Sequence, residues 1–364
     1  MHILVLVIQI PLYLLPKRGT QYQSTGRAIH NVDAHLFARG DMGRIAVTDG
    51  MSEEAIKLLE DKGHEVVLRH YNPDEISTGS LTEFDAVIIR SATKLPAELI
   101  AASTSDKGGL RFIGRAGVGV DNIDINEASK HGIVVCNTPG ASTRSVVEIT
   151  IGHLIASTRN IATADRTLRA GLWEKKNLRG TEIGGKNLGL IGFGRIAQGV
   201  AQAARSFGMD VHAYDPFVDK EFEGITMHDA VDDVFSNCTH ISVHCNLTDE
   251  TRHMINTERI SMMPEIGADG IDCGNHIVSC ARGGIVDEDA ALQALESGQL
   301  RTLALDVFES EPLGQSPLLN HDSFHGSPHI AASTLEAQAR IGIEMASLLI
   351  EFFDSGKTST SLNL

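Results

Sequence analysis

Cysteine is scarce in this sequence, and the few cysteines present form no recognisable disulfide or metal-binding pattern. There are five, an odd number, and none belongs to a CxxC pair. This pattern favours a reducing compartment, which we take to be the cytoplasm. We therefore expect neither structural disulfides nor a bound metal.

Long apolar runs and positive charge are also lacking. The apolar run at residues 3–15 contains Gln9 and Pro11 and is too short to span a bilayer comfortably. The 31 Lys and Arg residues are outnumbered by 47 Asp and Glu residues, which gives a formal net charge of −16. This balance argues against nucleic acid or a membrane surface as a partner. An anionic small molecule would need arginines and lysines that are clustered locally.

The remaining composition is that of an ordinary globular protein, with 42% apolar and 21% charged residues. A length of 364 residues suggests two domains, because single cores rarely grow beyond about 250 residues. Residues 1–42 differ from the rest and are interpreted as a leader outside the folded domains, with Met42 as the working start. A targeting peptide is the alternative interpretation of this leader.

Residues 186–215 have the pattern of a strand, a glycine turn, a helix and a second strand that ends at Asp215. In the GxGxxA turn, Gly192 permits the tight bend and Gly194 lets the backbone approach a pyrophosphate at the helix N-terminus. Ala197 is small enough for the helix to pack on the strand. Asp215 is placed to accept from a ribose 2′-OH and to repel a 2′-phosphate, so NAD is the expected cofactor. Enzymes that bind S-adenosylmethionine share this turn, and the turn alone does not exclude them.

Strand and helix patterns alternate on both sides of this unit, which predicts two parallel α/β domains. After the first strand, Ser52 is expected to cap a helix. The longest helical pattern covers residues 143–172 and would join the two domains. A last helical pattern at residues 334–353 is expected to return and pack on the first domain.

Three short pieces after the cofactor unit carry side chains suited to hydride transfer. CARGGIVDE, DVFESEP and SPHIAAST each follow or end a predicted strand, where open sheets bind ligands. His329 is expected to take a hydroxyl proton, because imidazole titrates near neutral pH. Glu311 would orient that imidazole and stabilise its protonated form. Arg282 would hold a substrate carboxylate and polarise the ketone.

From about residue 43 to its end, the chain resembles the D-isomer-specific 2-hydroxyacid dehydrogenase family. The motifs that carry the resemblance are VIIRSATKL, IGRAGVGVDNID, CNTPGAST, LWEKKNLRGTEIGGKNLGLIGFGRIA, CARGGIVDE, ALDVFESEP and PHIAASTLEAQ. The resemblance implies an α/β fold of two doubly wound parallel-sheet domains, with a Rossmann NAD-binding domain inserted in a flavodoxin-like substrate domain. It implies a substrate-binding domain of residues 43–141 and 333–364 and an NAD-binding domain of residues 142–332. It also implies an active site in the cleft and a homodimer, while a tetramer stays open.

The same matching implies roles for individual residues. Arg282, Glu311 and His329 correspond to the catalytic residues of the family. The residues implied along the cofactor are Gly192, Gly194, Arg195, Ile196, Asp215, Cys245, Cys280, Ala281, Asp306, His329 and Ala332.

The substrate side of the resemblance points to members that act on a phosphorylated acid, through the pieces RSATK, GRAG and WEKK. The backbone of residues 91–93 (Ser91, Ala92, Thr93) would hold the substrate carboxylate, and Arg90, Arg115 and Lys175 or Lys176 would bind the phosphate. We therefore expect NAD-dependent oxidation of D-3-phosphoglycerate to 3-phosphohydroxypyruvate, the first step of serine biosynthesis. The alternatives are a reductase of glyoxylate, hydroxypyruvate or another 2-keto acid, and a non-catalytic, NAD(H)-sensing scaffold of the corepressor type.

Two departures from the family pattern carry expectations of their own. Residues 267–276 are inserted before the strand that leads to Arg282, and we expect them to loop out and leave that strand in place. The resemblance ends without the C-terminal serine-sensing domain of many members, so inhibition by serine through such a domain is not expected.

Overall fold

The structure, a computed structural model, describes residues 42–105 and 108–363. The leader predicted at residues 1–42 therefore lies outside the described residues except for Met42. Among the described residues, no helix has the length and apolar character needed to cross a membrane.

The first part of the chain forms a parallel five-stranded sheet in the order β2-β1-β3-β6-β7. Its strands are short and mostly buried on both faces, as expected when helices cover a parallel sheet. The order is that of a flavodoxin-like sheet. Strands are added outward in one direction from β1 to β2 and in the opposite direction from β3 onward, so the switch point lies between β1 and β3. The strands are β1 (Arg44–Val47), β2 (Glu65–Leu68), β3 (Ala86–Ile89), β6 (Phe112–Arg115) and β7 (Val134–Asn137).

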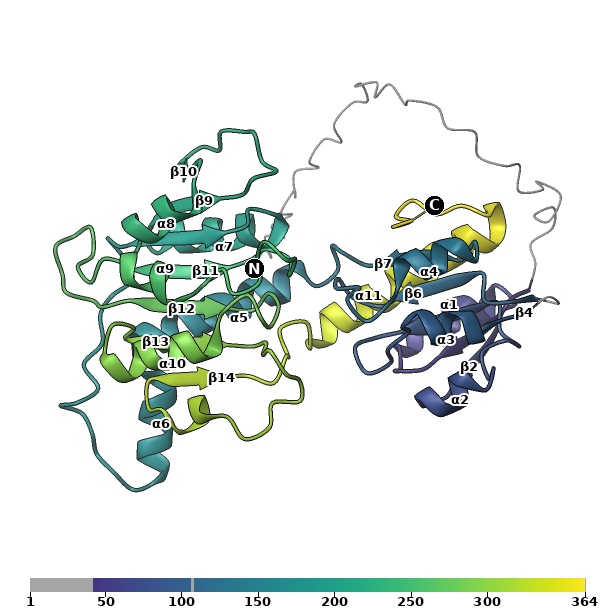
Figure 1. Cartoon of the computed structure of the whole chain (residues 1–364), viewed down its shortest axis with the longest axis horizontal. Helices are drawn as coiled ribbons and strands as arrows, with labels where there is room; N and C mark the ends of the chain where they lie inside the picture. Colours follow the sequence, from purple (N-terminus) through teal and green to yellow (C-terminus); the bar gives the residue numbers. More distant parts are fainter. Residues whose placement is uncertain (1–41, 106–107, 364) are drawn as a thin grey trace, which may run out of the picture. The chain divides into compact units, whose positions relative to one another are not determined.

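Short helices connect these strands, and a long helix from the end of the chain completes the unit (Figure 1). Helix α11 (Leu335–Ser355) packs against α1 (Glu53–Asp61), and its Met345, Leu349 and Phe352 share a buried cluster with the sheet residues Ile45 and Phe112. Each such buried side chain contributes about 1.5–3 kcal/mol. The prediction that the C-terminal helix returns to the first domain is confirmed. The other helices are α2 (Pro73–Ser77), α3 (Ala97–Ala102) and α4 (Ile125–Lys130), with a small pair β4 (Thr104–Ser105) and β5 (Gly108–Gly109).

The packing of α11 also explains why the predicted cap of α1 is wrong. Ser52 occupies the N-cap position of α1, but its side chain makes no capping hydrogen bond. Its hydroxyl is buried beside Gly342 of α11, where a Cβ would lie only 2.6 Å from it.

The second sheet has seven parallel strands in the order β10-β9-β8-β11-β12-β13-β14. This is the doubly wound order of a dinucleotide-binding fold, and it confirms the predicted fold class. Its strands are β8 (Asn187–Ile191), β9 (Asp210–Tyr214), β10 (Ile225–Met227), β11 (His240–Val243), β12 (His276–Ser279), β13 (Thr302–Leu305) and β14 (Phe324–Gly326). The two edge strands, β10 and β14, are only three residues long. The strand expected before SPHIAAST corresponds to β14, whereas β10 was not predicted.

Alternate strand residues face two different helical layers, as the period of a strand requires. Val278 lies in the cluster formed with α5 (Thr143–Thr158) and α7 (Arg195–Ser206), whereas Ile277 lies in the cluster formed with the helices on the other face. Those helices are α8 (Val231–Asn237), α9 (Thr257–Met262) and α10 (Glu288–Ser297), and a 3₁₀ turn, η2 (Pro317–Asn320), lies beside α10.

The single helix predicted over residues 143–172 is wrong, because the chain forms two helices there. α5 ends at Thr158, and α6 (Ile161–Arg169) begins after Asn160, whose φ of +54° lies in the left-handed region. A residue in that conformation interrupts a right-handed helix. The longest described helix is α11, with 21 residues.

The inserted residues 267–276 form a compact turn before β12. The N–H of Gly267 donates to the carbonyl of Ile271, and Asp269 accepts from Lys186 Nζ at 2.6 Å. Strand β12 then pairs with β11 and β13 along its full length. The insertion therefore leaves the strand that leads to Arg282 in place, as predicted.

Candidate functional site

The glycine turn between β8 and α7 is built against the strand beside it. Gly192 has a φ of +88°, and a Cβ on it would lie 2.8 Å from the backbone nitrogen of Cys245. Gly194 differs, because a Cβ there would meet nothing within 4 Å. The first glycine is thus required by the fold, whereas the second leaves open space at the start of α7 where a phosphate can approach the free N–H groups.

Asp215 follows β9 and ties this turn together. Its Oδ2 accepts from the N–H of Phe193 at 2.8 Å, and its Oδ1 accepts from the N–H of Phe217 at 3.0 Å. The carboxylate remains half-buried, so it keeps lone pairs that a ribose hydroxyl can reach. The sequence indicated that Asp215 could bind the ribose, but it did not indicate that Asp215 also holds the glycine turn.

The other residues predicted along the cofactor lie on the same edge of the sheet. Arg195 is exposed at the start of α7, and its guanidinium donates to the carbonyl of Pro139 at 3.3 Å. Ile196, Ala281 and Ala332 are half-buried, and Ala332 accepts from the side chain of Gln338 through its carbonyl. Burial raises the pKa of Cys245 to about 11 and that of Cys280 to about 12, so both thiols stay protonated at neutral pH and are poor nucleophiles.

The side chain of Asp306 is enclosed by the protein. The residue is completely buried, and its two carboxylate oxygens accept from Ser327 Oγ and from the N–H groups of Ile330 and Ala331. These donors come from the loop after β14, which folds back over the carboxylate. The predicted place of Asp306 along the cofactor stays a prediction.

His329 and Glu311 form the pair that was predicted from the sequence. Nδ1 of His329 lies 2.7 Å from Oε2 of Glu311, and Oε1 of Glu311 accepts from the N–H of Phe308 at 3.0 Å. With Nδ1 engaged, the Nε2 edge of the imidazole is left for a substrate. His329 has a φ of +51°, a strained conformation for a residue with a side chain, of the kind that clusters at functional sites.

The pair is electrostatically matched. Burial by itself raises the pKa of Glu311, but hydrogen bonds from His329 and Phe308 and the charges of His329 and Arg282 outweigh it, so the pKa is lowered. Glu311 is therefore ionised at neutral pH. An ionised carboxylate at this position stabilises the imidazolium that forms when His329 takes a proton.

Arg282 is held from two sides. Its Nε donates to Oδ2 of Asp121 at 2.9 Å, and its Nη1 donates to the carbonyl of Ala281 at 2.7 Å. Nη2 lies over Gly119, where a Cβ would approach it to 1.8 Å. Neither Asp121 nor Gly119 was identified as part of the site from the sequence, although both belong to the GVGVDN piece that carried the resemblance.

Arg90 and Arg115 form a second cationic group at the carboxyl ends of β3 and β6. Burial, followed by the charges of Arg282 and Arg90, lowers the pKa of Arg115 to about 10. Its Nε is buried without a hydrogen-bond partner among the residues that the structure describes. Like charges brought together around a buried, unpaired donor favour an anion at this position.

The loop after β3 is pinned at both ends. Asp49, at the carboxyl end of β1, accepts from the N–H groups of Arg90 and Thr93 and from the hydroxyl of Thr93, and Asn122 donates to the carbonyls of Arg90 and Thr93. Burial raises the pKa of Asp49, but these bonds with Thr93 and Arg90 lower it overall. The exposed residues between, Ser91 and Ala92, are thereby held in a fixed turn.

Lys175, the lysine predicted to bind the phosphate, lies in an exposed loop. Both Lys175 and Lys176 are exposed in the loop after α6, and no ion pair involves either one within residues 42–105 and 108–363. Among the described residues, no hydrogen bond or ion pair links either lysine to Arg90 or Arg115. Their predicted role in phosphate binding stays a prediction.

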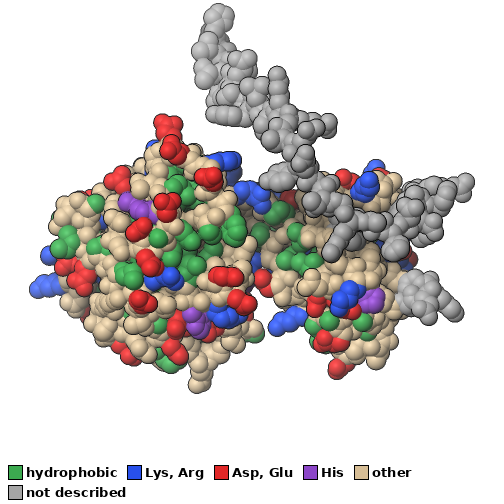
Figure 2. Space-filling view, turned by 45° about the horizontal axis from the view of Figure 1, so that its top comes forward, with side chains coloured by type: hydrophobic (Ala, Val, Ile, Leu, Met, Phe, Trp, Pro, Cys, Tyr) green, Lys and Arg blue, Asp and Glu red, His purple; other side chains and the backbone are tan. Residues whose placement is uncertain are grey.

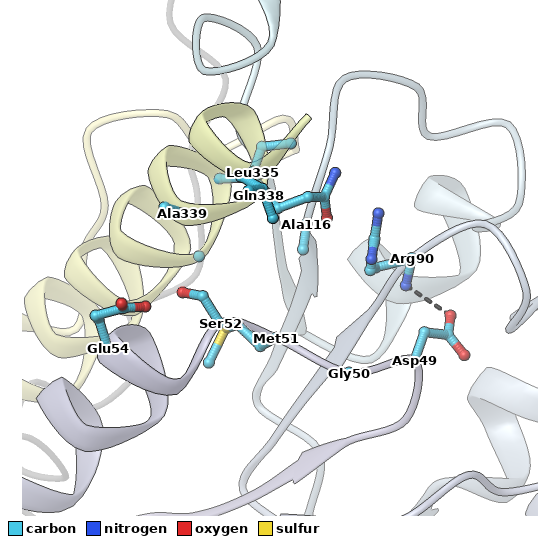
Figure 3. A pocket seen from close by; sticks show the side chains of 12 residues that line it. Asp49, Gly50, Met51, Ser52, Glu54, Arg90, Ala116, Leu335, Gln338 and Ala339 are labelled. Atoms are coloured by element: carbon cyan, nitrogen blue, oxygen red, sulfur yellow. Dashed lines mark hydrogen bonds between the residues drawn. The ribbon is translucent and has the colours of Figure 1, made fainter. Parts of the chain in front are cut away.

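A cavity of about 490 Å³ lies at the carboxyl edge of the first sheet (Figure 3). The loop after β1 and the first turns of α11 form its walls, and the side chains of Arg90 and Gln338 extend from opposite sides over Ala116. This is the switch point between β1 and β3, where doubly wound sheets bind ligands. Gln338 was not identified from the sequence, although it belongs to the last matching motif.

Comparisons with known proteins agree with this geometry. Residues 151–331 match the family model described as D-isomer specific 2-hydroxyacid dehydrogenase, NAD binding domain, so this stretch is an NAD-binding domain. The chain is 44% identical over 306 residues to a hydroxypyruvate reductase of Thermotoga maritima, covering 83% of this chain and 95% of that protein. It is 41% identical over 308 residues to a D-3-phosphoglycerate dehydrogenase of Methanocaldococcus jannaschii, covering 84% and 56%.

A solved structure shows the same fold. The NAD⁺-bound 3-phosphoglycerate dehydrogenase of Entamoeba histolytica superposes with a TM-score of 0.73 at 29% identity, covering 89% of this chain and 99% of that one. The chain spans 56% of the length of the Methanocaldococcus relative, whereas it spans nearly the whole of the Thermotoga relative.

Proposed function

The chain belongs to the D-isomer-specific 2-hydroxyacid dehydrogenase family, and on this premise we propose that it oxidises D-3-phosphoglycerate to 3-phosphohydroxypyruvate with NAD⁺, the first step of serine biosynthesis. The observation that supports dehydrogenase activity is the His329–Glu311 pair, 2.7 Å apart and joined electrostatically to Arg282. We assign the substrate to residues 43–141 and 333–364 and the cofactor to residues 142–332.

The proposed chemistry follows from these side chains. Bound NAD⁺ supplies the acceptor for the hydride that leaves C2 of the acid. Nε2 of His329 takes the proton of the C2 hydroxyl, and ionised Glu311 stabilises the resulting imidazolium through Nδ1–H. Arg282 holds the carboxylate beside the developing ketone, assisted by the backbone of Ser91 and Ala92. In the reverse direction His329 returns the proton to the ketone oxygen.

A phosphate on the substrate is supported by Arg90 and Arg115. The chain has a net charge of −16, and on the face shown in Figure 2 the basic side chains are scattered among acidic ones. Two arginines beside the cavity at the switch point are therefore a local concentration of positive charge in an acidic protein. A dianionic phosphate fits this group better than a neutral substituent does.

The direct test is a panel of acids followed by NADH absorbance. D-3-phosphoglycerate should be turned over with a kcat/KM at least about tenfold above that of any unphosphorylated 2-hydroxy acid, the equivalent of about 1.4 kcal/mol. Arg115→Met should remove this preference, whereas Arg205→Met serves as a charge-matched control, because the exposed Arg205 donates to the carbonyl of Glu223 and lies outside the proposed phosphate site. A parent enzyme that shows no preference for the phosphorylated acid would refute the substrate assignment.

The second candidate is a reductase of glyoxylate, hydroxypyruvate or another 2-keto acid. It is favoured by the 44% identity to the hydroxypyruvate reductase of Thermotoga maritima, which this chain matches over 95% of its length. The same panel run with NADH and keto acids separates the two. A non-catalytic NAD(H)-sensing scaffold is the weakest candidate, because such a protein has no need for Arg282, Glu311 and His329 together.

We also propose a cytoplasmic homodimer. Helix α6 buries none of its residues, and Ile161, Leu168, Leu172 and Trp173 are all at least half exposed on it and the loop that follows. A second copy of the chain is the occupant we propose, because four exposed apolar side chains on one short segment of a protein with a net charge of −16 call for a partner surface. Sedimentation analysis should show a dimer that Leu168→Glu dissociates; a monomeric parent would refute the proposal.

The five free cysteines agree with a reducing compartment, the basis for proposing the cytoplasm.

A further inference from the structure

Three consecutive backbone N–H groups in the loop after β14 all donate to one residue, Asp306. The N–H of His329 donates to its carbonyl oxygen at 2.8 Å, that of Ile330 to Oδ1 at 2.9 Å and that of Ala331 to Oδ2 at 2.9 Å. Asp306 itself follows β13 and is completely buried. One carboxylate thus determines the path of the chain on both sides of the proton-accepting imidazole.

This arrangement accounts for the strained backbone of His329. The successive N–H groups of Ile330 and Ala331, which both donate to the carboxylate, form a concave nest of the kind in which a left-handed residue alternates with a right-handed one. His329 supplies the left-handed residue, with a φ of +51°. The conformational cost of this backbone is offset only while the carboxylate stays in place. The position of the imidazole therefore depends on how firmly Asp306 is held.

Asp306 is held by a buried chain of polar side chains. Ser327 Oγ donates to Oδ1 of Asp306 at 2.5 Å, and Nε2 of His153 lies 3.0 Å from the same Oγ. Because the Ser327 hydroxyl has one proton and gives it to the carboxylate, it must accept from Nε2–H of His153. Burial lowers the pKa of His153, in keeping with a neutral imidazole that carries this proton. Ser327 and His153 are both largely buried, the first in the loop and the second on α5.

We propose that His153 is a positioning residue for the reaction, acting through Ser327 and Asp306 on the backbone that carries His329. It orients the hydroxyl of Ser327 toward Asp306, and Asp306 in turn holds the nest in the conformation that presents Nε2 of His329 to the substrate. The inference rests on the proposed function, which makes His329 the proton acceptor. It gives helix α5, far from His329 in the sequence, a part in catalysis.

The test replaces His153 by Phe, which keeps an aromatic ring and removes the donor. We expect kcat to fall about tenfold while the KM of the acid and the Kd of NADH change less than twofold, because a small misplacement of a reacting group acts on the rate. His153→Gln, whose Nε2–H can donate to Ser327, should restore most of the rate. His212→Asn is the matched control, since His212 is a half-buried histidine of the same sheet unit that pairs with His228 instead.

A second variant tests the same hydrogen-bonded chain in case His153→Phe does not fold. Ser327→Ala removes the link between His153 and Asp306, and it should lower kcat by a similar factor. The double variant should be no slower than Ser327→Ala alone, because both changes break the same chain. Additive losses, or a His153→Phe enzyme with the kcat of the parent, would overturn the proposal.

A readout that needs no turnover separates this inference from the proposed function. The ring ¹⁵N resonances of His329, followed with pH in the full chain bound to NADH, should differ between His153→Phe and the parent and remain unchanged in His212→Asn. If the parent oxidises no 2-hydroxy acid, the proposed function fails while this measurement still decides whether His153 positions His329. Unchanged His329 resonances in both His153→Phe and Ser327→Ala would refute the positioning role.

Discussion

Arg282 and Asp121 form an ion pair, Nε to Oδ2 at 2.9 Å, although they follow strands of two different sheets. Asp121 thereby occupies one N–H of the guanidinium that the proposed mechanism gives to the substrate carboxylate. Asp121 is 62% exposed, and Arg282 keeps a second bond to the carbonyl of Ala281. If Arg282 holds the substrate carboxylate as proposed, the substrate competes with the carboxylate of Asp121 for this arginine.

Asp121→Asn should therefore lower the KM of the acid, by up to about fivefold, since exposed ion pairs contribute about 1 kcal/mol or less. We expect kcat to change little, because Ala281 still holds the guanidinium. Steady-state kinetics on the preferred acid provide the measurement, and Asp165→Asn, which breaks an exposed pair with Arg169, is the control. A rise in KM would show that Asp121 positions Arg282 instead of competing for it.

Glu311→Gln should lower kcat about 10²-fold, because a neutral amide cannot stabilise the imidazolium of His329. The pKa of Glu311 lies below the ordinary 4.5 of a glutamate. Its carboxylate is therefore ionised at pH 4.5 and above, and its negative charge is lost only at a lower pH. The carboxyl ¹³C resonance of Glu311, followed with pH in the parent enzyme, should accordingly stay that of a carboxylate from neutral pH down to about pH 5. A carboxyl group that titrates between pH 7 and 6 would contradict an ionised Glu311.

Changing the two glycines of the turn to alanine should affect different properties, stability for Gly192 and NADH affinity for Gly194. Gly192→Ala places a Cβ 2.8 Å from the backbone nitrogen of Cys245 at a φ of +88°, so we expect a loss of stability of at least about 1 kcal/mol in chemical unfolding. Gly194→Ala meets open space and should unfold like the parent, but with NADH bound more weakly in a fluorescence titration. Equal NADH affinity in Gly194→Ala would show that no phosphate approaches this position.

Asp215 should decide between the two dinucleotides. We expect NAD to bind much more tightly than NADP, and Asp215→Ala to narrow the ratio about tenfold, equivalent to about 1.4 kcal/mol. Because the carboxylate also accepts from Phe193 and Phe217, the alanine variant should lose some NAD affinity as well. Asp215→Asn keeps an acceptor for Phe193 and isolates the effect of charge. Equal affinities for NAD and NADP in the parent enzyme would rule out this role.

The buried His276 should make stability depend on pH. Burial lowers its pKa from the ordinary 6.5 to about 4, so the unfolded chain takes up a proton near pH 6.5 that the folded chain refuses until about pH 4. The contribution to the free energy of unfolding is therefore complete above pH 6.5 and declines, by up to about 3 kcal/mol, as the pH falls toward 4. Urea unfolding of His276→Gln should show a shallower decline than the parent, whereas the exposed His70→Gln should not. Parallel curves for His276→Gln and the parent would contradict the shifted pKa.

The sequence by itself determined the features that depend on local chemistry. Alternating apolar strands and amphipathic helices predicted two parallel α/β domains, and the spacing from Gly192 to Asp215 identified the dinucleotide unit. The order of Arg282, Glu311 and His329 after that unit indicated hydride transfer. Such patterns are readable because a period of two or 3.6 residues and a φ that favours glycine are properties of a few neighbouring residues.

Only the tertiary structure decided which carboxylates and donors meet. Asp49 and Asn122 pin the loop of residues 90–93, Asp121 pairs with Arg282, and Asp306 accepts from the loop that carries His329. The short edge strand β10 forms because a neighbouring strand already offers its backbone groups. The break at Asn160 likewise needed the fold, since the helical pattern continues through it. These outcomes depend on partners many residues away in the chain, and hydrogen bonds of that kind leave no periodic signal along a sequence.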